Sequence, residues 1–201
     1  DDDSPGVRAE QDGGDGDATV NVSGSVSTGG RDSPALHALQ EARDGDVIVN
    51  VSGGTVRATG ANSQAILAEQ AGRDGNVLIN TNGVVESSNG NAIDAFLQGN
   101  GTVNITTAGS VSGTTGIVVQ NRAAMAPATI TAFATITGTG GTAIDLRGDG
   151  NDIVNLGGGT VLNGSIDFGN GNDGMGGTNP NDIDTLNILP GFNGIVNFAD
   201  T

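Results

Sequence analysis

The sequence has no cysteine, no tryptophan and no tyrosine, and only 5 of its 201 residues are phenylalanine. Without cysteine, the chain has neither a disulfide framework nor a thiolate metal site. A compact globule of this length normally uses more aromatic side chains to fill its core. The composition therefore favours a fold whose core is built from small aliphatic side chains.

Positive charge is also scarce, with 7 basic against 23 acidic residues and a formal net charge of −16. Phosphate backbones and anionic membrane surfaces repel such a polyanion, so we expect no nucleic-acid partner. No segment reaches the roughly 18 consecutive apolar residues of a membrane-spanning helix, so we expect no membrane insertion of this segment. Small cations are the natural partners of this composition.

What the chain does contain is glycine, 36 residues of it, between short runs of valine, isoleucine, leucine and alanine. The most regular element is an asparagine between two aliphatic residues, which recurs at intervals of 24 to 32 residues. Each copy is followed by a small-residue corner, two further short apolar segments and an acidic glycine corner. This pattern predicts three short strands per repeat, each with alternating inward and outward side chains.

A unit with one apolar face cannot fold alone, but stacked units share a continuous core. We therefore predict an all-β fold, a right-handed three-sided parallel β-helix (β-solenoid) of about seven coils in a single domain. Residues 17–201 would form the repeat domain, and residues 1–16 an acidic, glycine-rich N-terminal cap or arm. A β-sandwich is the alternative, although it does not explain an asparagine in nearly every repeat.

The stretch GDGNDIVNLGGGTVLNGSIDFGNGNDGMGG, followed by DIDTLNI, resembles the coils of autotransporter passenger domains. These domains are the secreted β-helical portions of type V secretion proteins. The resemblance extends over residues 17–198. It implies an extracellular or bacterial cell-surface location, with adhesion, aggregation or shielding as the common roles.

The recurring asparagines have two interpretations, a binding surface or a structural ladder. Stacked amides hydrogen-bond to one another between neighbouring strands, so we favour the structural ladder. Its predicted members are Asn21, Asn50, Asn80, Asn104, Asn155 and Asn187.

Two near-matches to a calcium-binding nonapeptide begin at Arg147 and Phe168. If their corners stack, carboxylate and amide oxygens gather in the kind of pocket that calcium prefers. The alternative is that these residues only shape turns. The predicted ligands are Asp149, Asp152, Asn170 and Asp173. The segment 147–149 is also an Arg-Gly-Asp tripeptide, the sequence that integrins recognise, although three-residue motifs arise by chance.

Three outward acids, Asp94, Asp145 and Asp167, are expected in one column, where a glycan-cleaving site would need them. Val118 separates Asp94 from the other two, and the face lacks aromatic platforms for sugar rings. The single histidine, His37, has no nucleophile arranged beside it. We therefore predict that the protein is not an enzyme.

The sequence thus predicts an extracellular, non-enzymatic β-helix with a structural or adhesive role. The only candidate cofactor is calcium. A calcium-binding module is the alternative function, and a polysaccharide-cleaving enzyme is a further alternative. A host or bacterial surface receptor is one expected partner. A second copy of the chain is the other, because an open solenoid exposes unpaired strand edges, and head-to-tail pairing would build a filament.

Overall fold

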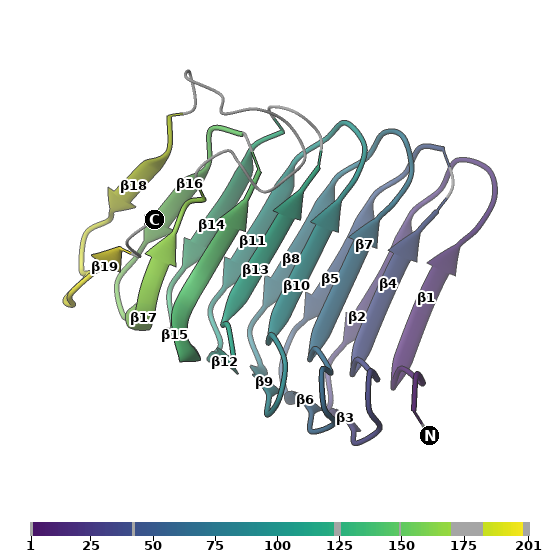
Figure 1. Cartoon of the computed structure of the whole chain (residues 1–201), viewed down its shortest axis with the longest axis horizontal. Coiled ribbons are helices and arrows are strands. Elements are labelled where there is room, and N and C mark those ends of the chain that lie inside the picture. Colours follow the sequence, from purple (N-terminus) through teal and green to yellow (C-terminus); the bar gives the residue numbers. More distant parts are fainter. Residues whose placement is uncertain (1, 42, 123–125, 149, 170–182, 199–201) are drawn as a thin grey trace.

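The computed structural model shows a three-sided parallel β-solenoid, described over residues 2–41, 43–122, 126–148, 150–169 and 183–198. Strands stack side by side along one axis, from the purple N-terminal strands to the yellow C-terminal strands (Figure 1). Strands of successive coils pair in parallel. The predicted all-β solenoid and single domain are confirmed.

The first side of the solenoid is a seven-stranded sheet whose outer surface we call the amide face. Its strands are β2 (Ala18–Val22), β5 (Val47–Val51), β8 (Val77–Thr81), β11 (Val103–Thr107), β14 (Ala128–Ala132), β16 (Ile153–Leu156) and β18 (Thr185–Ile188).

The other two sides belong to one 12-stranded sheet. The second side holds β3 (Val26–Thr28), β6 (Thr55–Ala58), β9 (Val84–Ser87), β12 (Val111–Gly113) and the first parts of β15 (Thr135–Arg147) and β17 (Val161–Asp167). The third side, whose outer surface we call the charged face, holds β1 (Val7–Gln11), β4 (Leu36–Gln40), β7 (Ile66–Gln70), β10 (Ile93–Leu97), β13 (Ile117–Asn121), the ends of β15 and β17, and β19 (Asn197–Phe198).

The described residues make about six turns, fewer than the predicted seven. The difference lies in the last repeat, where β18 is followed, among the described residues, only by the two-residue strand β19. At the other end, β1 pairs in register with β4. The solenoid therefore already begins within residues 1–16, which the sequence assigned to a cap or arm.

The core is a stack of aliphatic side chains, which explains the scarcity of aromatic residues. Ile66, Ile93, Ile117 and Ile144 are completely buried and follow one another in register on the third side. Neighbouring strands lie about 4.8 Å apart, so each isoleucine packs directly on the next. A narrow triangular interior filled in this way has little room for rings.

Glycine is required at the corner that follows the third side. Gly45, Gly75 and Gly101 occupy equivalent places in successive coils, with φ of 147°, 145° and 156°. A Cβ atom on Gly75 would lie 1.9 Å from the carbonyl oxygen of Gly45, and one on Gly101 would lie 1.9 Å from that of Gly75. Coils can stack at this corner only because no side chain is present.

Candidate functional site

Asparagine side chains form a hydrogen-bonded column on the amide face. Asn21, Asn50 and Asn80 are in register on neighbouring strands. The Nδ2 of Asn50 donates to the Oδ1 of Asn21 at 2.9 Å, and the Nδ2 of Asn80 donates to the Oδ1 of Asn50 at 3.1 Å. The amide of Asn50 thus donates to one coil and accepts from the next, which is the arrangement expected of a structural ladder.

Asn104 lies outside this column, contrary to the prediction. Strand β11 places Thr106 opposite Asn80, and Asn104 opposite Leu78. A shift of two residues leaves the same set of side chains facing the core, so the apolar pattern does not resist it. Asn104 donates instead to the Oγ1 of Thr102, at 2.9 Å.

The column resumes beyond β11. The Nδ2 of Asn155 donates to the Oγ1 of Thr131 at 3.2 Å, and the Nδ2 of Asn187 donates to the Oδ1 of Asn155 at 2.9 Å. The complete amide column is Asn21, Asn50, Asn80, Thr106, Thr131, Asn155 and Asn187. A second outward column on the same face is Thr19, Ile48, Leu78, Asn104, Thr129, Ile153 and Thr185.

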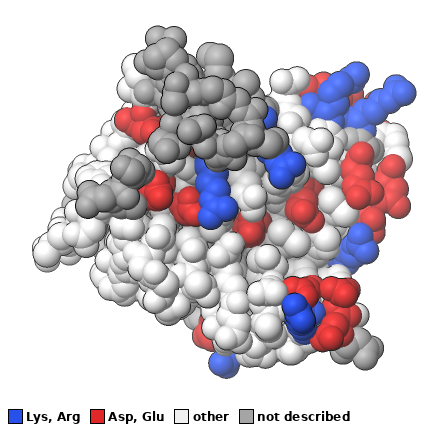
Figure 2. Space-filling view, in the orientation of Figure 1, with Lys and Arg blue, Asp and Glu red and all other residues white. Residues whose placement is uncertain are grey.

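The amide face is free of charge. None of the residues in its seven strands is acidic or basic, although the chain carries a formal net charge of −16. Charged residues lie instead at the corners and on the other two sides, where Figure 2 shows mixed acidic and basic side chains on the charged face and the N-terminal corners. Among the described strands, those of the amide face therefore carry no charged side chain, whereas the second side carries the ion pair of Arg57 and Glu86.

A second ladder, which the sequence did not predict, runs along the corner before the amide face. The Oδ1 of Asp17 accepts the backbone N–H of Asp46 at 2.9 Å, and the Oδ1 of Asp46 accepts that of Asn76 at 2.7 Å. The Oδ1 of Asn76 accepts the N–H of Thr102 at 3.0 Å. These side chains satisfy backbone donors of the next coil, so the acidic corner has a structural use without any ion. The available signal was an Asp or Asn directly before a strand of the amide face.

Asp152 stands in the equivalent place before β16 and is only 3% exposed. Its Oδ1 accepts the backbone N–H of Ala128 at 2.7 Å, and its own N–H donates to the Oδ1 of Asp184 at 3.0 Å. One oxygen of this predicted calcium ligand is thus committed to the backbone. The other three predicted ligands lie outside the described residues: Asp149, Asn170 and Asp173.

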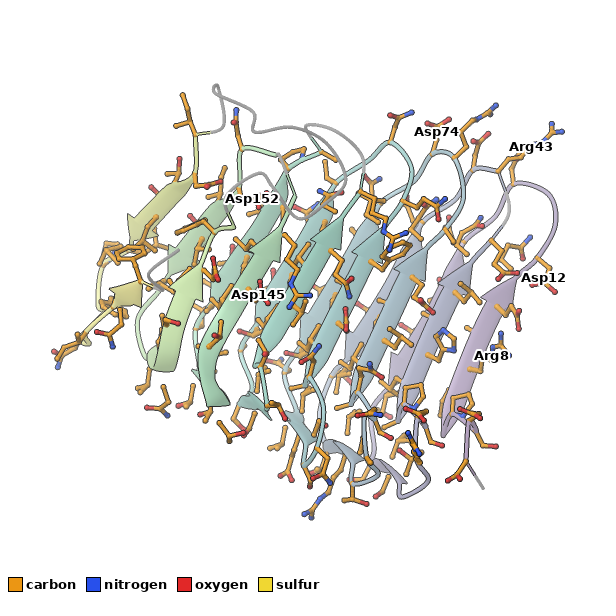
Figure 3. The ribbon with its side chains drawn as sticks, in the orientation of Figure 1. Arg8, Asp12, Arg43, Asp74, Asp145 and Asp152 are labelled. Atoms are coloured by element: carbon orange, nitrogen blue, oxygen red, sulfur yellow. The ribbon has the colours of Figure 1, made fainter. Side chains whose placement is uncertain are left out.

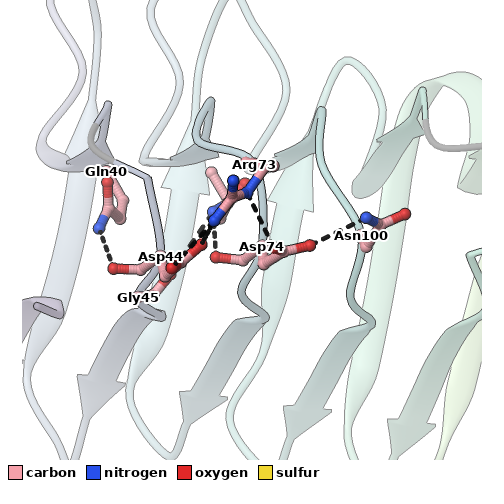
Figure 4. A network of polar contacts seen from close by, with 7 residues as sticks. Gln40, Asp44, Gly45, Arg73, Asp74 and Asn100 are labelled. Atoms are coloured by element: carbon pink, nitrogen blue, oxygen red, sulfur yellow. Dashed lines mark hydrogen bonds and ion pairs between the residues drawn. The ribbon is translucent and has the colours of Figure 1, made fainter. Parts of the chain in front are cut away.

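Stacked acids elsewhere in the same corner share an arginine (Figure 4). The guanidinium of Arg73 bonds to the carboxylates of Asp44 at 3.2 Å and Asp74 at 3.1 Å, and the Nδ2 of Asn100 donates to Asp74 at 2.9 Å. The hydrogen bond from Asn100, together with Arg73, lowers the pKa of Asp74 below its ordinary value. The lowered pKa keeps Asp74 ionised, and Arg73 pairs with both Asp44 and Asp74.

An open groove of about 1120 Å³ runs over the corners that follow β1, β4, β7 and β10. Asp15 and Arg43 are among the residues that line it. Asp12 and Glu41 also line it, and their carboxyl oxygens and those of Glu10 lie within 4.8 Å of one another. All three side chains are exposed, and solvated acidic groups of this kind occur without a bound ion.

On the charged face, Asp94, Val118, Asp145 and Asp167 follow one another in register, in the order expected from the sequence. Asp145 lies on β15 (Figure 3). The Nε of Arg147 donates to Asp145 at 3.0 Å, so the arginine of the Arg-Gly-Asp tripeptide is bound to its own face. The aspartate of that tripeptide lies outside the described residues.

Asp94 is shielded rather than open to a substrate. It is 5% exposed, and its two carboxylate oxygens accept hydrogen bonds from Gln120 at 3.0 Å and Asn91 at 3.1 Å. Burial raises the pKa of Asp94 above its ordinary value, against the effect of these donors. The lone histidine, His37, is also engaged, with its Nε2 2.7 Å from the carboxylate of Glu69.

Within the described part of the chain, no helix combines the length and the apolar character that crossing a membrane requires. Comparison with protein-family models finds no match, and comparisons with curated proteins and with solved structures find none either. Function must therefore be inferred from the residues and geometry of this chain.

Proposed function

We propose that this chain is an extracellular, surface-associated β-helix with a structural and adhesive role and without enzymatic activity. The observation that carries the proposal is the amide face, an uncharged side on a chain of net charge −16. Self-repulsion keeps polyanions apart, and a neutral side is where that repulsion interferes least with contact. The regularly spaced amide and hydroxyl groups on this face both donate and accept hydrogen bonds.

The polar ladders support the structural part of the proposal. Asp17, Asp46 and Asn76 bond to the backbone of the next coil, and the amide column bonds coil to coil on the neighbouring side. These bonds stiffen the solenoid along its length. The resemblance of residues 17–198 to autotransporter passenger coils supports the location outside the cell.

The adhesive role is tested by measuring retention of the protein on hydroxyl-terminated, anionic and cationic surfaces. We expect retention on the neutral surface to persist in about 0.5 M salt, where charge effects reach only a few ångströms. Ile48→Asp should abolish it, whereas Ser112→Asp, an equal charge change on the second side, should not. Retention only on the cationic surface, and only at low salt, would show that net charge rather than the amide face makes the contact.

A calcium-binding module is the second candidate, favoured by the clustered oxygens of Glu10, Asp12 and Glu41. Calcium takes six to eight oxygen ligands, so three exposed carboxylates would leave most positions to water. A rise in melting temperature in millimolar calcium that chelator reverses, and that Glu41→Gln removes, would establish this candidate. An unchanged melting temperature would reject a calcium requirement for folding.

A further inference from the structure

We propose that the partner of the amide face is a second copy of this chain, packed face to face and antiparallel about a two-fold axis through β11. The inference rests on the proposed adhesive function and names one partner of that surface. It follows from the distribution of charge over the three sides and from the order of the outward residues.

Charge leaves the amide face as the favourable approach for another copy. The second side carries Arg57 and Glu86, which form an ion pair at 3.4 Å that contact would have to desolvate. The charged face carries acids such as Asp145 and Asp167. Two chains of net charge −16 repel each other, and contact through acidic sides would add local repulsion. The seven strands of the amide face contribute no charge to that repulsion.

The order of outward residues is close to a palindrome. From β2 to β18 the second outward column reads Thr, Ile, Leu, Asn, Thr, Ile, Thr, with Asn104 of β11 at its centre. Consider a two-fold axis that runs along the strand direction through β11. It places this column opposite the same column of the second copy, with the order of the residues reversed. Ile48 then meets Ile153 of the second copy, Thr19 meets Thr185, and Asn104 meets Asn104. Such mutual pairing is what an isologous interface requires.

The amide column fits the same operation. It contains only asparagine and threonine, whose side chains donate and accept, so it pairs with itself in either order. The other face-to-face axis, along the solenoid, would set the column of Ile48 and Leu78 against the amide column. Partly exposed aliphatic side chains would then cover amides without pairing them, which is costly. The antiparallel arrangement pairs Ile48 with Ile153 and keeps the amide column opposite itself, and its one mismatch sets Leu78 against Thr129.

The size of the face indicates a weak, reversible dimer. Seven strands about 4.8 Å apart span about 29 Å, and five residues at about 3.3 Å each span about 16 Å. The footprint is therefore about 460 Å² per copy and about 900 Å² for the pair, below the range of about 1,200–2,000 Å² of stable interfaces. We expect dimers only at high protein concentration, as on a crowded surface.

The proposal is tested by sedimentation velocity of the full chain over a wide concentration range. The wild type and the control Ser112→Lys should form dimers, and Ile48→Lys should be monomeric. Combining Ile48→Lys with Ile153→Glu should restore the dimer, because each introduced lysine then faces an introduced glutamate of the other copy. A monomeric wild type at every concentration, or a double variant that stays monomeric, would overturn the proposal.

Cross-linking tests the axis. The chain has no cysteine, so Asn104→Cys supplies a single thiol on the proposed two-fold, and a short bismaleimide should join two copies there. Asn21→Cys, three strands from the axis, should not react with itself; if it does and Asn104→Cys does not, the axis is wrong. Growing oligomers with no product at Asn104→Cys would refute the interface in favour of end-to-end pairing. Neutral-surface adhesion by a strictly monomeric chain would refute the dimer alone and leave the adhesive role standing.

Discussion

Replacing Asp152 with alanine removes the acceptor from a buried backbone donor. The Oδ1 of Asp152 accepts the N–H of Ala128 at 2.7 Å, and Ala128 is completely buried. An unpaired buried donor costs about 1–3 kcal/mol, and a hydrogen bond to a charged group is worth more than a neutral one. We expect Asp152→Ala to lower the free energy of unfolding by about 2–4 kcal/mol. Asp152→Asn keeps an oxygen in place and should cost only about 1 kcal/mol.

Because the chain has no tryptophan or tyrosine, unfolding is best followed by circular dichroism in urea. A shift of the midpoint at an unchanged slope measures the loss of stability. Wild type and both variants are compared in millimolar calcium and in chelator. If Asp152 acts as a backbone acceptor, the three proteins keep the same order of stability in calcium and in chelator. If Asp152→Asn is as damaging as Asp152→Ala, and both effects vanish in chelator, the carboxylate is a calcium ligand and our reasoning fails.

Three further predictions concern the corner glycines, the charged face and the amide column. Gly75→Ala, whose Cβ would lie 1.9 Å from a carbonyl oxygen at φ 145°, should abolish soluble folded protein, whereas Gly53→Ala, with its nearest atom at 3.8 Å, should express normally. Burial raises the pKa of Asp94 above its ordinary value of 3.8, so protonation of Asp94 favours the folded state. As the pH rises above 3.8, the wild type should therefore lose stability relative to Asp94→Asn, which the difference between their urea midpoints measures. Asn50→Ala breaks two hydrogen bonds of the ladder and should lower the free energy of unfolding by about 1 kcal/mol. In the same urea titration, Asn104→Ala should lower it by less than about 0.5 kcal/mol.

The architecture was predictable because its signals are local. Alternating apolar residues mark strands such as β5 (Val47–Val51), and glycine with acidic residues marks the corners. Residues 33–42 have some helical character, but their similarity to residues 63–71 favours a strand. Residues 33–42 contain β4 (Leu36–Gln40), and the similar segment contains β7.

The sites were harder to predict because they depend on the register between coils. The apolar pattern excludes a slip of one residue but accepts a slip of two, and this is why Asn104 was placed in the wrong column. The corner acids pose the same difficulty. In sequence, Asp152 looks like a metal ligand, and only the stacking of coils brings its carboxylate to the backbone N–H of a neighbouring coil.

These assignments bear on where the large negative charge acts. Asp44 and Asp74 share the single positive charge of Arg73, whereas Asp46 and Asp152 bond to the backbone and keep their negative charge. The net negative charge keeps copies apart over about 10 Å at moderate salt. Contact through a neutral face is opposed only by this long-range repulsion. Salt screens the repulsion, so added salt should strengthen the dimer. An interface made of ion pairs would weaken under the same change, and the sign of the salt effect on the dimer distinguishes the two kinds of contact.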